Sequence, residues 1–158
     1  MTKQTDTQQL IQSIADRVCL ESGAFVVDIS LTGTPRKRVI DIRVQTDEGI
    51  KSQECVEIAR RINEELGDQD LFDSPWDIQV GSPGIGFKIR NWRALKSQTG
   101  RLVLVTFKAT DRPVLKGHLK SIEPSGIILE IRKDRKQPAE LVTVDFEATD
   151  HVVVDIEW

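Results

Sequence analysis

The sequence predicts an α+β fold in which a mixed first part is followed by a second part made of strands. Three observations lead to this prediction. Apolar residues recur at helical spacing in two stretches, alternating strands accompany them, and from residue 101 onward the period changes to two. The chain has 158 residues, 39% hydrophobic and 30% charged, which is typical of a globular protein with one full domain or two small ones.

The first part is predicted to form a helix, two strands, a second helix and a third strand, in that order. Its apolar positions fall in the ranges 10–18, 25–31, 40–44, 55–66 and 76–80. The turn over 33–37 joins the first two strands into a hairpin, and Ser52 is predicted to cap the second helix. We expect one small sheet with both helices on one face.

The second part predicts five short strands with turn residues between most of them: Leu102–Phe107, Val114–Ile122, Ile127–Ile131, Leu141–Phe146 and Val152–Ile156. A small closed barrel of SH3-like type would remove the exposed strand edges. We place an N-terminal domain at 1–86, a junction with a short helix at 87–100 and the barrel at 101–158.

The junction begins with a strong turn pattern. Ser82-Pro83-Gly84 has proline and glycine in the order that a type II turn requires. Asn91 is expected to cap the short helix, and we interpret Trp92 as a core residue between the domains.

No catalytic group, metal site or cofactor is predicted. The histidines and cysteines are too far apart for zinc ligands, and no serine, cysteine or paired carboxylate adjoins a histidine. The acidic loop with Asp68, Asp70 and Asp73 lacks the glycine and terminal glutamate of an EF-hand, so we interpret it as solvated. The two histidines of the chain are His118 and His151, and its two cysteines are Cys19 and Cys55.

The chain is expected to be soluble and cytoplasmic. Its first residues are polar, no apolar run is long enough to span a membrane, and two lone cysteines fit a reducing compartment. The net charge of −3 means that any contact with RNA must come from local patches.

Three such basic patches are present, and we expect them to converge on one accessible surface. They are Arg36-Lys37-Arg38 at the hairpin tip, Lys88, Arg90 and Arg93 in the junction, and Arg132, Lys133, Arg135 and Lys136 in a loop between strands. Together they offer phosphate contacts, with Phe87 as a possible stacking group. Each patch alone is also compatible with an ordinary solvated turn.

Four stretches of the sequence, in this order, resemble the bacterial ribosome maturation factor RimP family. They are the hairpin with Phe25–Ile29 and Ile40–Val44, the turn at Asp47–Ile50, the strand end at Val80–Ile85, and Lys116–Leu119. The most distinctive is the third, which contains Ser82, Pro83 and Gly84 followed by an aliphatic residue.

The resemblance implies a KH-like αββαβ domain followed by an Sm/SH3-like barrel. It also implies a role in assembling the small (30S) ribosomal subunit, through ribosomal RNA and the ribosomal protein near the decoding centre, with no membrane or small-molecule substrate. The sequence departs from the family where Gly86-Phe87-Lys88 replaces Asp-Arg-Pro, and where the last corner, 146–150, is acidic. Such a corner suits a basic protein better than RNA.

Two other classes of function are open at this point. One is a protein–protein adaptor whose basic clusters contact only solvent. The other, less favoured, is a hydrolase or transferase whose site is assembled from residues distant in sequence.

Overall fold

The structure is a computed structural model that describes residues 3–67, 69, 71–72 and 75–157. The chain divides into two compact units, the first ending at Ser82 and the second beginning at Pro83. The stretch 87–100, predicted as a separate junction, therefore lies within the second unit. The first unit ends at Ser82, four residues before Gly86, where the predicted N-terminal domain ends. Asp68, Asp70 and Asp73 of the predicted acidic loop lie outside the described residues.

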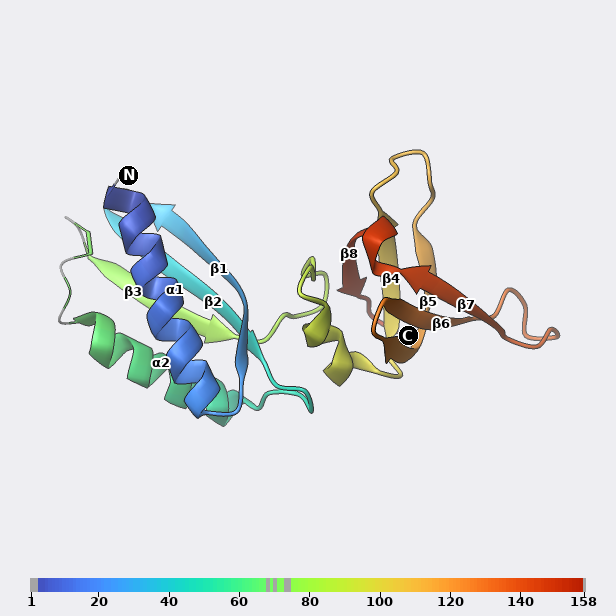
Figure 1. Cartoon of the computed structure of the whole chain (residues 1–158), viewed down its shortest axis with the longest axis horizontal. Helices are drawn as coiled ribbons and strands as arrows, with labels where there is room; N and C mark the ends of the chain where they lie inside the picture. Colours follow the sequence, from blue (N-terminus) through green and yellow to red (C-terminus); the bar gives the residue numbers. More distant parts are fainter. Residues whose placement is uncertain (1–2, 68, 70, 73–74, 158) are drawn as a thin grey trace. The chain divides into compact units, whose positions relative to one another are not determined.

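The first unit has the predicted αββαβ order (Figure 1). Strands β1 and β2 form the predicted antiparallel hairpin, and β2 pairs in parallel with β3, so the sheet order is β1-β2-β3. Its elements are α1 (Lys3–Glu21), β1 (Phe25–Thr34), β2 (Lys37–Gln45), α2 (Ser52–Gly67) and β3 (Trp76–Gly81). The prediction of an α+β chain is confirmed.

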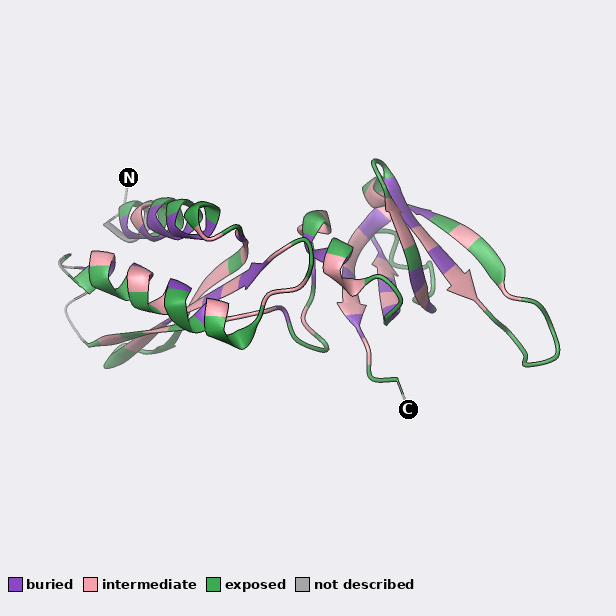
Figure 2. Ribbon diagram, turned by 90° about the horizontal axis from the view of Figure 1, so that it is seen from below, coloured by how far each residue is buried: buried purple, intermediate pink, exposed green. Residues whose placement is uncertain are grey.

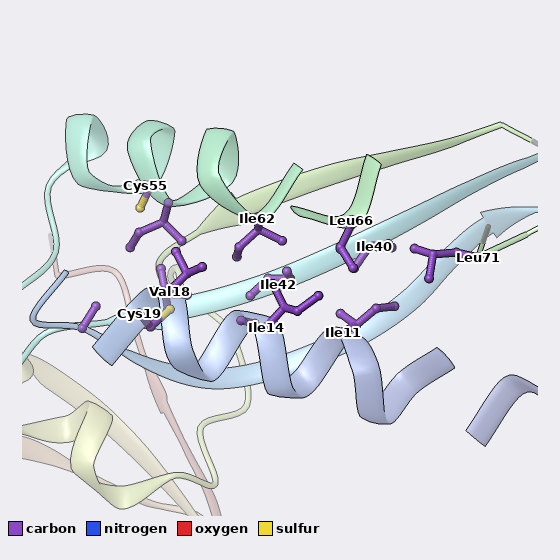
Figure 3. Close-up of a cluster of buried hydrophobic side chains, with 14 residues drawn as sticks. Ile11, Ile14, Val18, Cys19, Ile40, Ile42, Cys55, Ile62, Leu66 and Leu71 are labelled. Carbon is purple, nitrogen blue, oxygen red and sulfur yellow. The ribbon is translucent and has the colours of Figure 1, made fainter. Parts of the chain in front are cut away.

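Both helices cover the same face of this sheet, as predicted, and the core lies between the layers (Figures 2 and 3). Ile11 and Val18 of α1 are fully buried, and so are Ile58 and Ile62 of α2. Ile11 and Val18 lie seven positions apart and Ile58 and Ile62 four, which brings each pair to one face of its helix. They contact the central strand β2 through Ile40, Ile42 and Val44.

Helix α2 begins at Ser52, so its N-cap lies one residue earlier than predicted. The carbonyl oxygen of Lys51 accepts the first helical bond from Cys55, and the Glu54 carboxylate accepts the Lys51 N–H at 3.1 Å. This is the returning half of a capping box, so Lys51 and not Ser52 is the N-cap residue. The buried Gln45 side chain fixes the preceding turn by accepting the Ile50 N–H at 2.6 Å.

The second unit contains one five-stranded antiparallel sheet in the order β7-β6-β5-β4-β8. The five predicted strands are confirmed as β4 (Leu102–Phe107), β5 (Leu115–Glu123), β6 (Gly126–Ile131), β7 (Glu140–Asp145) and β8 (Thr149–Val154). No ladder joins β7 to β8 within the described chain, so the predicted hydrogen-bonded closure is wrong. The 3₁₀ turn η2 (Phe146–Ala148) connects these two edge strands instead.

The turn predicted at Ser82-Pro83-Gly84 forms further along the chain. The Phe87 N–H bonds to the Gly84 carbonyl at 3.1 Å, and Gly86 has a φ of +82°. A type II turn needs its positive φ at the third residue, and Gly86 supplies it while Gly84 does not. The turn residues are therefore Gly84 to Phe87.

The short helix predicted after this turn is the 3₁₀ helix η1 (Trp92–Gln98), capped by Asn91 as expected. Trp92 is half-buried and stacks on Phe146 of the same unit, with ring centroids 5.0 Å apart and planes 3° from parallel. Ala94 and Leu95 are buried. The observed contact of Trp92 thus lies inside the second unit, and its predicted place between the domains stays a prediction.

Candidate nucleic-acid interface

The hairpin tip directs its three cations to different surroundings. Lys37 Nζ forms an exposed ion pair with Asp77 Oδ2 at 3.1 Å, because Asp77 lies on the neighbouring strand β3. The Arg38 guanidinium lies 5.7 Å from the centre of the Phe72 ring. Arg36 is exposed, and no carboxylate among the described residues pairs with it. Arg36 is therefore the cation at this tip that is best placed for a phosphate.

Lys88 and Arg90 are positioned by the residue between them. Ile89 forms a two-bond bridge with Val152 of β8, at 2.8 and 3.0 Å, and is 1% exposed. Its extended neighbours Lys88 and Arg90 are both exposed. Arg90 Nη2 lies 3.3 Å from Asp150 Oδ2, whereas Lys88 has no carboxylate partner in the described part of the chain.

The loop between β6 and β7 is the most strongly basic segment of the second unit. Arg132, Lys133, Arg135 and Lys136 are all exposed, and none forms an ion pair with a described residue. Asp134 forms no ion pair with them: its carboxylate accepts the Lys136 main-chain N–H at 3.3 Å, and its carbonyl accepts that of Gln137, so its single charge offsets only one of the four. Asp134 acts as the turn former, which leaves four cations in solvent. We call residues 132–136 the basic loop.

Within the second unit the two basic clusters do not converge. Figures 1 and 2 show the basic loop at the far end of the β6–β7 hairpin, whereas the Lys88–Arg90 stretch lies beside β8 at the opposite end of the sheet. The expectation of one shared surface is therefore wrong for these two clusters. A nucleic acid could use either cluster alone, or a path long enough to reach both.

Each histidine lies beside a carboxylate, and both cysteines are buried. His118 Nε2 lies 2.6 Å from Glu157, and His151 Nδ1 lies 2.6 Å from Asp150. Burial raises the pKa of the Cys19 thiol to about 11 and also raises that of Cys55, which keeps both thiols protonated at neutral pH. Over the described ranges, no three His, Cys, Asp or Glu residues are grouped to hold a metal ion.

None of the helices in the described ranges combines the length and the apolar character that crossing a bilayer would demand.

Two polar contacts near the site were not found by sequence reasoning. Arg43 Nη1 donates to the Ser82 carbonyl oxygen at 3.0 Å, and Asp150 joins Arg90 to His151. The hydrogen bond from His151, with a smaller contribution from Arg90, holds the pKa of Asp150 below its usual value. The contact of Arg43 was only weakly indicated by the sequence. Arg43 alternates with the apolar residues of a predicted strand, and a cation in such a position needs a partner.

Comparison with known proteins places these features in a family. The model of the RimP N-terminal domain matches residues 14–86, which include Ser82, Pro83 and Gly84. A ribosome maturation factor RimP from Pelodictyon phaeoclathratiforme is 34% identical over 122 residues, covering 73% of this chain and 69% of the relative. The chain belongs to the RimP family.

Further RimP relatives extend the match along the chain. The ribosome maturation factor RimP of Prosthecochloris aestuarii is 26% identical over 154 residues, covering 87% of this chain and 86% of its own length. That of Chlorobium phaeobacteroides is 33% identical over 119 residues, covering 68% and 69% respectively. The RimP likeness therefore includes the second unit as well as the first, and the predicted family is confirmed.

Proposed function

We propose that this chain is a ribosome maturation factor that binds the free small (30S) ribosomal subunit and promotes its maturation without catalysing a reaction. The observation that carries the proposal is membership of a family whose relatives are named ribosome maturation factors. The surroundings of the histidines and cysteines support a binding role, because each is either paired with a carboxylate or held as a buried thiol.

The architecture fits the two domain types that the resemblance implies. The αββαβ order of the first unit is that expected of a KH-like domain, and the five-stranded antiparallel sheet with η2 before its last strand suits an Sm/SH3-like domain. Domains of these kinds present loops and strand edges to their partners.

Contact with ribosomal RNA is assigned to exposed cations. Arg36, Lys88 and the four cations of the basic loop are accessible and free of carboxylate partners among the described residues. Lys37, Arg38 and Arg90 contribute less directly, since each already has a neighbour in the structure. Exposed ion pairs of this kind are worth little, so a phosphate can replace the carboxylate.

The protein partner within the subunit is taken to be the basic ribosomal protein near the decoding centre, and the place of action is the cytoplasm. The exposed carboxylates of Asp145 and Glu147, with the half-buried Asp150 beside them, give the second unit an acidic corner. A basic protein is attracted to such a corner, whereas the phosphates of RNA are repelled.

Co-sedimentation tests the proposal directly. The purified chain is mixed with free small subunits, free large subunits and assembled ribosomes, at low and at high salt. We expect it to sediment with free small subunits at low salt and to be released at high salt, because phosphate contacts weaken as salt rises. Failure to sediment with free small subunits at low salt would contradict the proposal.

The second candidate is a protein–protein adaptor that does not contact RNA. The ion pairs of Lys37 and Arg90 favour it, because they engage cations that RNA would otherwise use. In that case the chain would bind a ribosomal protein in isolation, with an affinity that changes little when the basic loop is neutralised.

A further inference from the structure

Among the described residues of the second unit, only one of the two edges of the five-stranded sheet is open. The outer edge of β8 is covered by the preceding chain, since Ile89 exchanges two main-chain bonds with Val152 and the Gly86 N–H bonds to the Val154 carbonyl at 3.0 Å. In the part of the chain that the structure describes, β7 pairs with β6 alone. An uncovered edge strand presents main-chain donors and acceptors to other chains.

The register shows which main-chain groups of β7 point outward. β6 and β7 pair without a shift from Ile131↔Glu140 to Gly126↔Asp145, and the Phe146 N–H bonds to the Ser125 carbonyl at 2.9 Å in the same register. Main-chain groups of an antiparallel strand alternate between its partner and the open side. Since Phe146 points toward β6, the N–H and C=O groups of Leu141 and Thr143 point away from it.

The side chains along this edge indicate the charge of a partner. Glu140 and Asp145 are exposed at the ends of β7, and Glu147 is exposed in η2. None of the three forms an ion pair with a described residue, and β7 itself contains no cation. Leu141 between them is 64% exposed, which offers an apolar contact to a residue paired opposite it.

We propose that the open edge of β7 binds an extended, cationic segment of a partner protein by strand addition. Main-chain bonds to Leu141 and Thr143 would supply affinity, and the carboxylates of Asp145 and Glu147 would select cations at that end of the segment. The inference rests on the proposed function for the class of partner, a basic ribosomal protein. The basic loop at the other end of the edge would stay available for RNA.

A proline substitution tests the outward main-chain groups of β7 without removing its bonds to β6. Thr143→Pro removes an outward N–H but no bond to β6, so the sheet retains its ladder. Thr143→Ala is the matched control, because it removes the side chain and keeps the N–H. Far-UV circular dichroism and the thermal midpoint check that both variants of the full chain are folded.

The binding probe is a synthetic peptide in which lysine alternates with valine, and a second peptide has glutamate in place of lysine. NMR spectra of the ¹⁵N-labelled full chain should show the lysine peptide shifting the amides of Leu141, Thr143 and Asp145. We expect binding to weaken about tenfold in Thr143→Pro and to change less than about twofold in Thr143→Ala. The glutamate peptide should not bind.

Equal binding by Thr143→Pro, equal binding of both peptides, or shifts confined to other surfaces would each overturn the inference. So would pairing of two copies through β7 in the peptide-free protein. Co-sedimentation of both variants with free small subunits separates the two proposals. Subunit binding that is unaffected by Thr143→Pro contradicts the edge alone, whereas a wild type that binds the lysine peptide and no subunits contradicts the proposed function alone.

Discussion

Arg43 holds the end of the first unit through Ser82, whose carbonyl oxygen accepts a hydrogen bond from Nη1 at 3.0 Å. Asp41 orients the same guanidinium, with Oδ2 3.3 Å from Nη2. Parallel pairing places Arg43 opposite Gly81, so the contact joins the central strand to the residue that precedes Pro83. The family motif is thus connected with the strand that carries the resemblance at Ile40–Val44.

Replacing Arg43 with glutamine should lower the free energy of unfolding of the first unit. The lost bond is charge-assisted and leaves the Ser82 carbonyl without this donor, which predicts a loss of about 1–3 kcal/mol. Urea unfolding measures it. Arg60→Gln is the matched control, because Arg60 forms only exposed pairs with Glu57 and Glu64 and should cost less than about 1 kcal/mol. Similar losses in both variants would contradict this account of Arg43.

Gly126 and Gly84 make a second matched pair. A Cβ on Gly126 would lie 2.1 Å from the Val144 carbonyl oxygen, and neither backbone can move without disturbing the β6–β7 pairing. Gly126→Ala should therefore destabilise the second unit by about 1–3 kcal/mol. Gly84→Ala meets nothing within 4 Å at a negative φ, so its effect should stay within about 0.5 kcal/mol. Thermal unfolding of both variants checks the difference.

The stacked rings of Trp92 and Phe146 should stabilise one another beyond the area that they bury. A double-mutant cycle with Trp92→Leu, Phe146→Leu and the double variant measures this directly. The parallel geometry at 5.0 Å predicts a coupling energy of about 0.5–1.5 kcal/mol. Strictly additive losses would mean that η1 and η2 pack independently.

Asp150 should titrate below its usual pKa in the folded protein. The bond from His151 and the nearby Arg90 favour its charged form, so their contribution to stability is present above the unfolded pKa. It is lost as the pH falls through the lower, folded pKa. ¹³C NMR of the carboxyl group should show the pKa rising toward its usual value in His151→Ala, and by less in Arg90→Gln. An unchanged pKa in His151→Ala would contradict the assignment.

The sequence predicted most of the fold because periodic burial decides it. Ile58, Ile62 and Leu66 recur on one helical face, and alternation located all five strands of the second unit. The prediction failed where a single backbone angle decides the position of a turn. Both Gly84 and Gly86 are compatible with a turn in the sequence, and only the positive φ of Gly86 shows which one forms it. Barrel closure failed because pairing of β8 with Ile89 depends on residues distant in sequence.

The candidate site was predictable in composition and less so in geometry. The cations of the basic loop could be identified because a charged run between two strands must be exposed. The ion pairs of Lys37 with Asp77 and of Arg90 with Asp150 could not, because each depends on which strands become neighbours. For the same reason, the separation of the two clusters within the second unit required the structure.

The salt dependence of binding to free small subunits tests the role of the basic loop most directly. On single-stranded phosphates the four cations of the basic loop should contribute about −3 to the slope of the logarithm of the binding constant against the logarithm of the salt concentration. Changing Arg132, Lys133, Arg135 and Lys136 to glutamine should make the slope less negative by about 3 and leave the smaller contribution of Arg36 and Lys88. Equal neutralisation at four exposed cations elsewhere in the unit, Lys96, Arg101, Lys108 and Lys120, should leave the slope unchanged. An unchanged slope in the basic-loop variant would contradict RNA contact through this loop.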